Sequence, residues 1–240
     1  MTLWILVTAF AYFVKGVTGF ANTLIITGVM AFSSANAAIT PVEVLLGFPS
    51  NALMVWKERR NIQPRKFIPV TLLLLAGTVP GALLLKTIDA RAIKILCGLV
   101  FTGLGLQMLL LGAKQGKLKP NRAVLTAIAV ASGIMGGLFG IGALMSTYMS
   151  RVTEDSHAFK GNLCAVFICD NLFRIGLYAC WGMINAEVLR QALILLPCML
   201  IGLLAGMYCA RFLKEDAVKR VIQIMLVISG VALTVTAIAG

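Results

Sequence analysis

Long apolar stretches, separated by short polar ones, run through the whole chain. Eight of them have the length of membrane-crossing helices, at residues 4–32, 38–56, 67–85, 92–112, 123–149, 161–181, 186–210 and 217–239. A helix that crosses a bilayer needs about 20 apolar residues, whereas a strand of a membrane barrel needs only about ten that alternate. The pattern therefore predicts an all-α integral membrane protein without a separate soluble domain.

Glycine clusters interrupt the first and the fifth of these runs, at residues 14–22 and 131–142. Because glycine costs roughly 1 kcal/mol in a helix interior, each cluster predicts a place where the backbone leaves the helix. Inside a membrane, the freed backbone groups are tolerated only where they are buried in protein or line a polar cavity. Paired interruptions in two halves of a chain indicate a transporter binding site. The overlay of the clusters places Gly16 and Gly19 on Gly133 and Gly136.

The second four runs repeat landmarks of the first four. The positions in register are Asn51 with Asn171, Gly77 with Gly202, and Gly81 with Gly206. We therefore expect one membrane domain made of two repeats, residues 1–118 and 119–240.

The positive charge of the chain, +12 net, lies mostly in the short loops and so indicates membrane topology rather than a nucleic-acid partner. If every run crosses once, the two sides hold ten and nine Lys and Arg residues. If both glycine-broken runs enter and leave on one side, the counts become fifteen and four. Arms of about eleven or twelve residues are also too short for a hydrocarbon core of about 30 Å. This predicts two inverted repeats, each a glycine-broken hairpin, re-entrant or discontinuous, plus three transmembrane helices.

Two cations lie inside apolar runs, Lys15 beside the first break and Arg174 one helical turn after Asp170. A cation at the bilayer centre costs about 2.5–3.5 kcal/mol on insertion scales, so each needs a compensating role. One interpretation is anion binding by both cations together with free N–H groups at the breaks. The alternatives are a lysine that reaches an interface and an Asp170–Arg174 pair that neutralises itself. Asp170 is also the candidate for carrying a coupling proton.

Several uncharged residues complete the predicted site. Asn51 and Asn171 can donate and accept without a charge, either to a substrate or as cross-links between helices. Glu43, next to Pro41, is expected at the membrane interface, with a coupling carboxylate as the alternative, and His157 is expected at the surface. The predicted substrate-binding residues are Lys15, Gly16, Thr18, Gly19, Asn22, Asn51, Ser132, Gly133, Gly136, Gly137, Gly140, Asn171 and Arg174.

The segments Lys15-Gly-Val-Thr-Gly-Phe20 and Gly133-Ile-Met-Gly-Gly-Leu-Phe-Gly-Ile-Gly142 resemble the motifs of the TauE/SafE family of sulfite or organosulfonate exporters. The resemblance covers essentially the whole chain. Such families usually follow the second motif with Gly-Pro, whereas Ala143-Leu144 follows here. The resemblance implies passive or ion-coupled movement of small sulfur-containing or carboxylated anions across a bacterial-type inner (plasma) membrane.

We therefore expect a secondary transporter, of exporter or permease type, that moves a small anion by alternating access at a midplane site. A sulfur-containing oxyanion or organosulfonate is the favoured substrate; an anion channel or a permease for small carboxylates is the alternative. An enzyme is not expected, because no nucleophile–base pair or metal cluster stands out. Neither cofactor nor metal is expected, the coupling ion (H⁺ or Na⁺) stays open, and the partners are the lipid bilayer and, as an option, a second copy of the chain.

Overall fold

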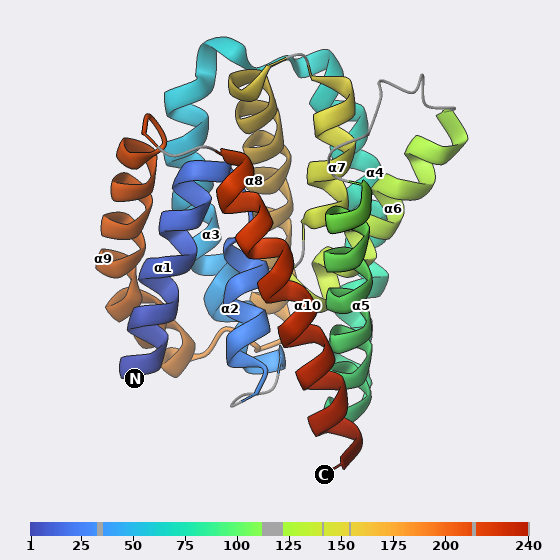
Figure 1. Cartoon of the computed structure of the whole chain (residues 1–240). Helices are drawn as coiled ribbons and strands as arrows, with labels where there is room; N and C mark the ends of the chain where they lie inside the picture. Colours follow the sequence, from blue (N-terminus) through green and yellow to red (C-terminus); the bar gives the residue numbers. More distant parts are fainter. Residues whose placement is uncertain (33–35, 112–121, 141, 154, 213–214, 240) are drawn as a thin grey trace.

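The structure, a computed structural model, is built of helices (Figure 1). It describes residues 1–32, 36–111, 122–140, 142–153, 155–212 and 215–239, and no strand occurs among these. The helices are α1 (Thr2–Thr18), α2 (Asn22–Met30), α3 (Asn36–Glu58), the short 3₁₀ helix η1 (Arg59–Asn61), α4 (Pro64–Thr87), α5 (Ala90–Leu111), α6 (Arg122–Phe139), α7 (Ala143–Val152), α8 (Ser156–Cys180), α9 (Ala186–Cys209) and α10 (Glu215–Ala239). Every apolar run carries one helix or two, so the all-helical prediction is confirmed.

The helix lengths and surfaces are those of an integral membrane protein. Within the described residues, four helices are long and apolar enough to cross a membrane, namely α3, α4, α8 and α9. Large apolar side chains such as Leu72, Leu193 and Ile201 are about two-thirds exposed on the outside of these helices. A soluble surface rarely carries so many exposed apolar side chains, whereas lipid tails solvate them without cost.

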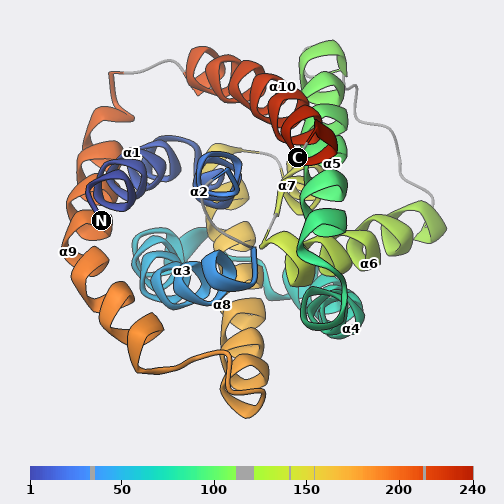
Figure 2. The ribbon, with the colours of Figure 1, turned by 90° about the horizontal axis from the view of Figure 1, so that it is seen from below.

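Helices α3 and α8 pack against each other near the middle of the molecule (Figure 2). Helices α1 and α9 pack together on one side of them, and α4 and α6 pack together on the other. A fourth extensive pairing joins α5 with α10. The predicted repeat boundary between residues 118 and 119 lies outside the described residues.

The two glycine-broken runs form helix hairpins that point toward each other. Helix α1 starts at the lower end of the molecule and α2 returns to that end, whereas α6 starts at the upper end and α7 returns there (Figure 1). The two hairpins are in contact, because the Thr27 hydroxyl of α2 donates to the carbonyl of Phe139, the last residue of α6, over 3.3 Å.

The hairpin arms are unequal, which corrects the expected eleven or twelve residues. Helices α1 and α6 have 17 and 18 residues, and α2 and α7 have 9 and 10. The backbone turns at Gly19 (φ 86°) and Gly140 (φ 72°), a left-handed conformation that glycine adopts without steric cost. Gly140 lies one turn beyond Gly136, so the overlay of Gly19 on Gly136 was wrong by four residues. Gly16 lies within helix α1, at a position where α1 packs closely against α9.

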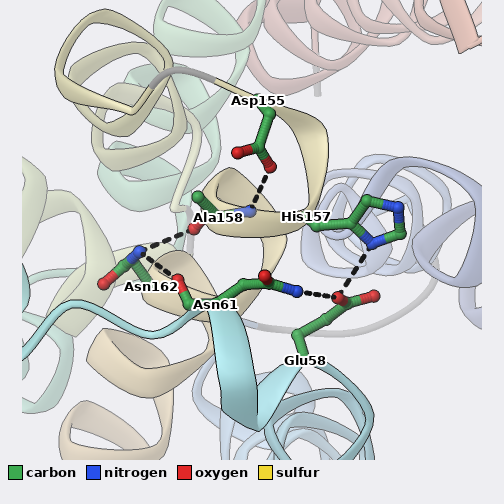
Figure 3. Close-up of polar contacts among 6 residues, drawn as sticks. All are labelled: Glu58, Asn61, Asp155, His157, Ala158 and Asn162. Atoms are coloured by element: carbon green, nitrogen blue, oxygen red, sulfur yellow. Dashed lines mark hydrogen bonds and ion pairs between the residues drawn. The ribbon is translucent and has the colours of Figure 1, made fainter.

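A polar cluster joins the end of α3 and η1 to the start of α8. Figure 3 shows its members, Glu58, Asn61, Asp155, His157, Ala158 and Asn162. Glu58 is buried, and its Oε2 accepts from Asn61 Nδ2 at 3.2 Å and lies 2.9 Å from His157 Nδ1. Asn162 Oδ1 accepts from the backbone N–H of Gln63 at 2.8 Å. The His157 side chain is 70% exposed, as expected for a surface residue.

Candidate functional site

A polar cavity of about 40 Å³ lies where the two helix breaks meet α3 and α8. This volume holds about three water molecules. The lining residues are Lys15, Phe20, Ala21, Asn22, Thr23, Leu24, Glu43, Gly47, Asn51, Leu74, Ser132, Gly136, Gly140, Gly142, Phe167, Asp170, Asn171 and Arg174.

Lys15 lies in the last turn of α1 and is only 1% exposed, so it does not extend to an interface. Its ammonium donates to the Ser50 hydroxyl over 2.8 Å, and that hydroxyl donates to the carbonyl of Gly47 over 2.8 Å. The ammonium also lies 5.6 Å from the centre of the Tyr12 ring, which favours a cation. No carboxylate of the described residues pairs with Lys15. Lys15 therefore contributes a buried positive charge to the cavity.

Arg174 is held rigidly by three contacts. Its Nε lies 3.0 Å from Asp170 Oδ2, which is the ion pair expected one turn apart on α8. Its Nη1 donates to the Gly136 carbonyl at 2.9 Å, and its Nη2 donates to Asn171 Oδ1 at 3.0 Å. A guanidinium has five N–H groups; Nη1 and Nη2 each use one in these contacts, the Tyr178 hydroxyl also interacts with the group, and the buried Nε makes no hydrogen bond of good geometry. Arg174 therefore forms the ion pair with Asp170 and also lines the cavity.

Glu43 is the residue of this cavity that the sequence analysis misplaced. Glu43 is 4% exposed and lines the cavity, so it is not the exposed group expected at an interface, and its alternative role as a coupling carboxylate stays a prediction. Helix α2 packs against α3, the helix that carries Glu43. Asn22 Nδ2 donates to Glu43 Oε1 at 3.2 Å, while Oε2 has no hydrogen-bond partner. The available signal was a lone carboxylate in an otherwise apolar run.

Nine of the predicted site residues line the cavity. They are Lys15, Asn22, Asn51, Ser132, Gly136, Gly140, Asp170, Asn171 and Arg174. Asn51 and Asn171, from the facing helices α3 and α8, both reach it, and Asn51 Oδ1 is a further buried acceptor without a partner. Ser132 lines the cavity but donates its hydroxyl to the Ile128 carbonyl of its own helix at 2.7 Å.

The other five predicted residues lie outside the lining. Thr18 and Gly19 shape the first break: the Thr18 hydroxyl lies 2.9 Å from the Phe20 carbonyl, and Gly19 N–H caps α1 by donating to the Lys15 carbonyl over 2.7 Å.

Gly16, Gly133 and Gly137 serve helix contacts instead. A Cβ on Gly16 would lie 2.5 Å from the Leu203 carbonyl of α9, and one on Gly137 would lie 2.5 Å from the Thr78 carbonyl of α4. Gly133 faces α4 in the same way. These glycines allow helix backbones to approach closely, as small residues do in membrane proteins.

An integral membrane protein in which two buried cations line one cavity has the features of the solute-handling membrane proteins. A family model described as "Sulfite exporter TauE/SafE" matches residues 4–233. The chain therefore belongs to the sulfite exporter TauE/SafE family, a family of membrane transporters, and the resemblance seen in the sequence is confirmed. Searches of curated proteins and of solved structures found no match to the chain.

Proposed function

We propose that the chain is a secondary transporter that carries a small anion, with a sulfur-containing oxyanion as the favoured substrate, through the cavity between α3 and α8. The observation that carries this proposal is the pair of buried cations, Lys15 and Arg174, that face one cavity from different helices. A buried cation without a ligand or counter-ion is costly in a membrane. Lys15 forms no direct ion pair among the described residues, so an anion in the cavity would stabilise it.

The size of the cavity favours a small substrate. An oxyanion such as sulfite has four non-hydrogen atoms and is comparable with the roughly three water molecules that fit. A larger organosulfonate would need the hairpins to move apart. Gly19 and Gly140, with backbone angles that permit such a change, lie at the inner ends of both hairpins and are natural hinges.

We also propose that the chain is built of two inverted repeats, α1–α5 and α6–α10, and works by alternating access. The helix pairings support this proposal, because exchanging the halves turns the α1–α9 pair into the α6–α4 pair and returns α3–α8 and α5–α10 to themselves. The sequence segments 57–66, 113–122, 151–160 and 211–220 together hold fifteen Lys and Arg residues. The first of these segments, which contains η1, lies at the upper end of Figure 1, and this favours that end as the cytoplasmic side of a bacterial-type inner membrane. In this orientation both hairpins are re-entrant.

Counterflow in proteoliposomes tests the function. Purified protein is reconstituted in vesicles loaded with unlabelled sulfite, and uptake of ³⁵S-sulfite from outside is followed. A carrier shows saturable uptake that internal sulfite accelerates. Flux that does not saturate and ignores internal sulfite would establish the channel instead. Uptake of acetate or malonate but not of sulfite would establish the carboxylate permease. If no anion enters faster than in protein-free vesicles, the transport proposal fails.

A further inference from the structure

The four charged groups of the cavity are unequally paired. Arg174 and Asp170 form an ion pair, and Asp170 Oδ1 also accepts from the Thr78 hydroxyl at 2.8 Å. Both oxygens of Asp170 therefore have partners, and removing its charge by protonation would break this arrangement. Lys15 and Glu43 are left over, and neither has an ion-pair partner within the described part of the chain.

Glu43 combines burial, a missing partner and access to the cavity. It is 4% exposed, and its Oε2 lacks a hydrogen-bond partner while Asn22 occupies Oε1. The backbone of Gly140 approaches the same oxygen, because a Cβ built there would lie 3.0 Å from Glu43 Oε2 and 3.5 Å from Arg174 Nη1. The free carboxylate oxygen and the guanidinium thus border the same corner of the cavity.

The charge balance of the cavity depends on the protonation of Glu43. When Glu43 is ionised, the charges of Lys15, Glu43, Asp170 and Arg174 cancel, and a bound monoanion would leave one uncompensated negative charge in the membrane interior. Such a charge is costly to bury. When Glu43 is neutral, the cavity carries one positive charge, which the monoanion cancels. The Glu43 O–H also becomes a donor that can point at the anion.

We propose that Glu43 takes up one proton when the anion binds, so that the protein carries a monoanion and a proton together. This inference rests on the proposed function. The proton comes from water on the side to which the cavity is open and returns to water on the other side with the anion, and no covalent bond of the anion forms or breaks. The coupling ion is then H⁺, and Glu43 rather than Asp170 carries it.

The other titratable groups that face this part of the molecule come from α1 and α8. They are Tyr12, Lys15, Asp170, Arg174 and Tyr178. Tyr178 is occupied, because its hydroxyl donates to the Gly137 carbonyl at 3.2 Å. Among the described residues, α2, α4, α6 and α7 contribute none to the cavity lining. Lys15 is the competing group, because loss of its charge at high pH would also weaken anion binding.

Methanesulfonate is a suitable probe because it keeps a single negative charge at all pH values of interest. Isothermal titration calorimetry of the full-length protein in detergent, in two buffers of different ionisation enthalpy, counts the protons taken up per bound anion. At a pH where Glu43 is ionised before binding, the wild-type protein is expected to take up nearly one proton per methanesulfonate; at low pH, where Glu43 is already neutral, it should take up none. Its affinity should be constant at low pH and fall by up to about tenfold per pH unit as Glu43 becomes ionised.

Three variants identify the side chain that takes up the proton. Glu43→Gln should bind methanesulfonate with no proton uptake and with an affinity independent of pH over the range in which Lys15 keeps its charge. Glu43→Asp, which keeps a carboxyl group one methylene shorter, should retain the pH dependence. Lys15→Arg, which keeps the charge but cannot titrate in this range, should retain it too.

The possible failures are distinct. If methanesulfonate binds the wild-type protein without proton uptake over the whole pH range, or if Glu43→Gln keeps the wild-type pH dependence, Glu43 is not the proton carrier although the anion site stands. The same holds if Lys15→Arg abolishes the pH dependence. If neither methanesulfonate nor sulfite binds the wild-type protein at any pH, the anion site itself is absent and both proposals fall. The number of protons that the wild-type protein takes up per methanesulfonate tests the proposal even if a variant does not fold.

Discussion

Ala21 has a positive φ of 78°, which a side chain disfavours, and it lines the cavity directly after the Gly19 turn. The left-handed conformation costs an L-residue about 1–2 kcal/mol, and such strain persists only where the surrounding structure holds it. Gly19 and Gly140 adopt similar angles without that cost. At the scale of single residues, the cavity is therefore defined by three backbone positions as much as by its charged side chains.

Gly140→Ala is expected to abolish anion binding. The new Cβ would lie 2.8 Å from Thr23 Cγ2 and 3.0 Å from Glu43 Oε2, inside the cavity and at a positive φ. Gly176→Ala on α8 is the matched control, because a Cβ there meets nothing within 4 Å, and it should bind like wild type. Binding of sulfite, followed by thermal shift, checks both. Normal binding by Gly140→Ala would show that the second break does not border the site.

At the scale of helices, glycine has two roles that spacing alone cannot separate. Gly137 and Gly140 lie three residues apart, yet the first packs against α4 and the second turns the chain. The sequence correctly located both breaks to within one turn. It could not tell which glycine turns and which one packs, because that depends on the neighbouring helix. For the same reason the sequence did not show that Glu43 is buried. Its burial depends on α2, the neighbouring helix, whose Asn22 contacts the carboxylate.

Gly133→Ala and Gly136→Ala form a matched pair on α6. The Gly133 Cβ would collide with the Leu74 carbonyl of α4, whereas the Gly136 Cβ would meet only Asp170 Oδ2 at 3.9 Å. Overpacking a close helix contact costs about 1–3 kcal/mol. We expect a lower melting temperature for Gly133→Ala and a nearly unchanged one for Gly136→Ala, measured in the same detergent. Equal melting temperatures would contradict the close α4–α6 contact.

Asn162→Ala is expected to destabilise the junction between η1 and α8. The variant removes the acceptor of the Gln63 N–H and a donor to the Ala158 carbonyl, which lies 2.7 Å away. Leaving such groups without partners costs about 1–3 kcal/mol where they are buried. His157→Ala, at an exposed side chain, should change the melting temperature less. The reverse order would show that the Glu58–His157 contact, not Asn162, holds this junction.

At the scale of the whole molecule, the apolar runs define a membrane protein, and the uneven distribution of Lys and Arg among its loops predicts its orientation. The all-helical architecture follows from the apolar run lengths, and the family from the two glycine motifs. Nine predicted residues meet at one cavity because both breaks project toward the α3–α8 pair. The distances between the cavity residues depend on tertiary packing. So does the lack of a direct ion pair at Lys15 among the described residues, and neither can be derived from local spacing in the sequence.

The orientation of the molecule can be tested with single cysteines. In a background without the six native cysteines, Arg60→Cys in η1 and Glu187→Cys in the first turn of α9 replace exposed residues. Segment η1 and the start of α9 lie at opposite ends of the helix bundle (Figure 1). The positive-inside rule predicts that a membrane-impermeant maleimide labels Glu187→Cys in intact cells and labels Arg60→Cys only after lysis. Labelling in the opposite pattern would invert the orientation, and labelling of both in intact cells would contradict the separation of the ends.

The most direct test of the central claim is anion binding to the purified protein by thermal shift. The panel comprises sulfite, sulfate, thiosulfate, taurine, sulfoacetate and short carboxylates, applied to the wild type, to Lys15→Ala, to Arg174→Ala and to the exposed control Arg190→Ala. A ligand that binds only the folded protein raises its melting temperature by mass action.

We expect one class of anion, sulfite among its members, to raise the melting temperature of the wild type and of Arg190→Ala. The same anions should have no effect on Lys15→Ala or Arg174→Ala. If no anion stabilises the wild type, or if the two cavity variants respond as the wild type does, the cavity between the helix breaks is not an anion site.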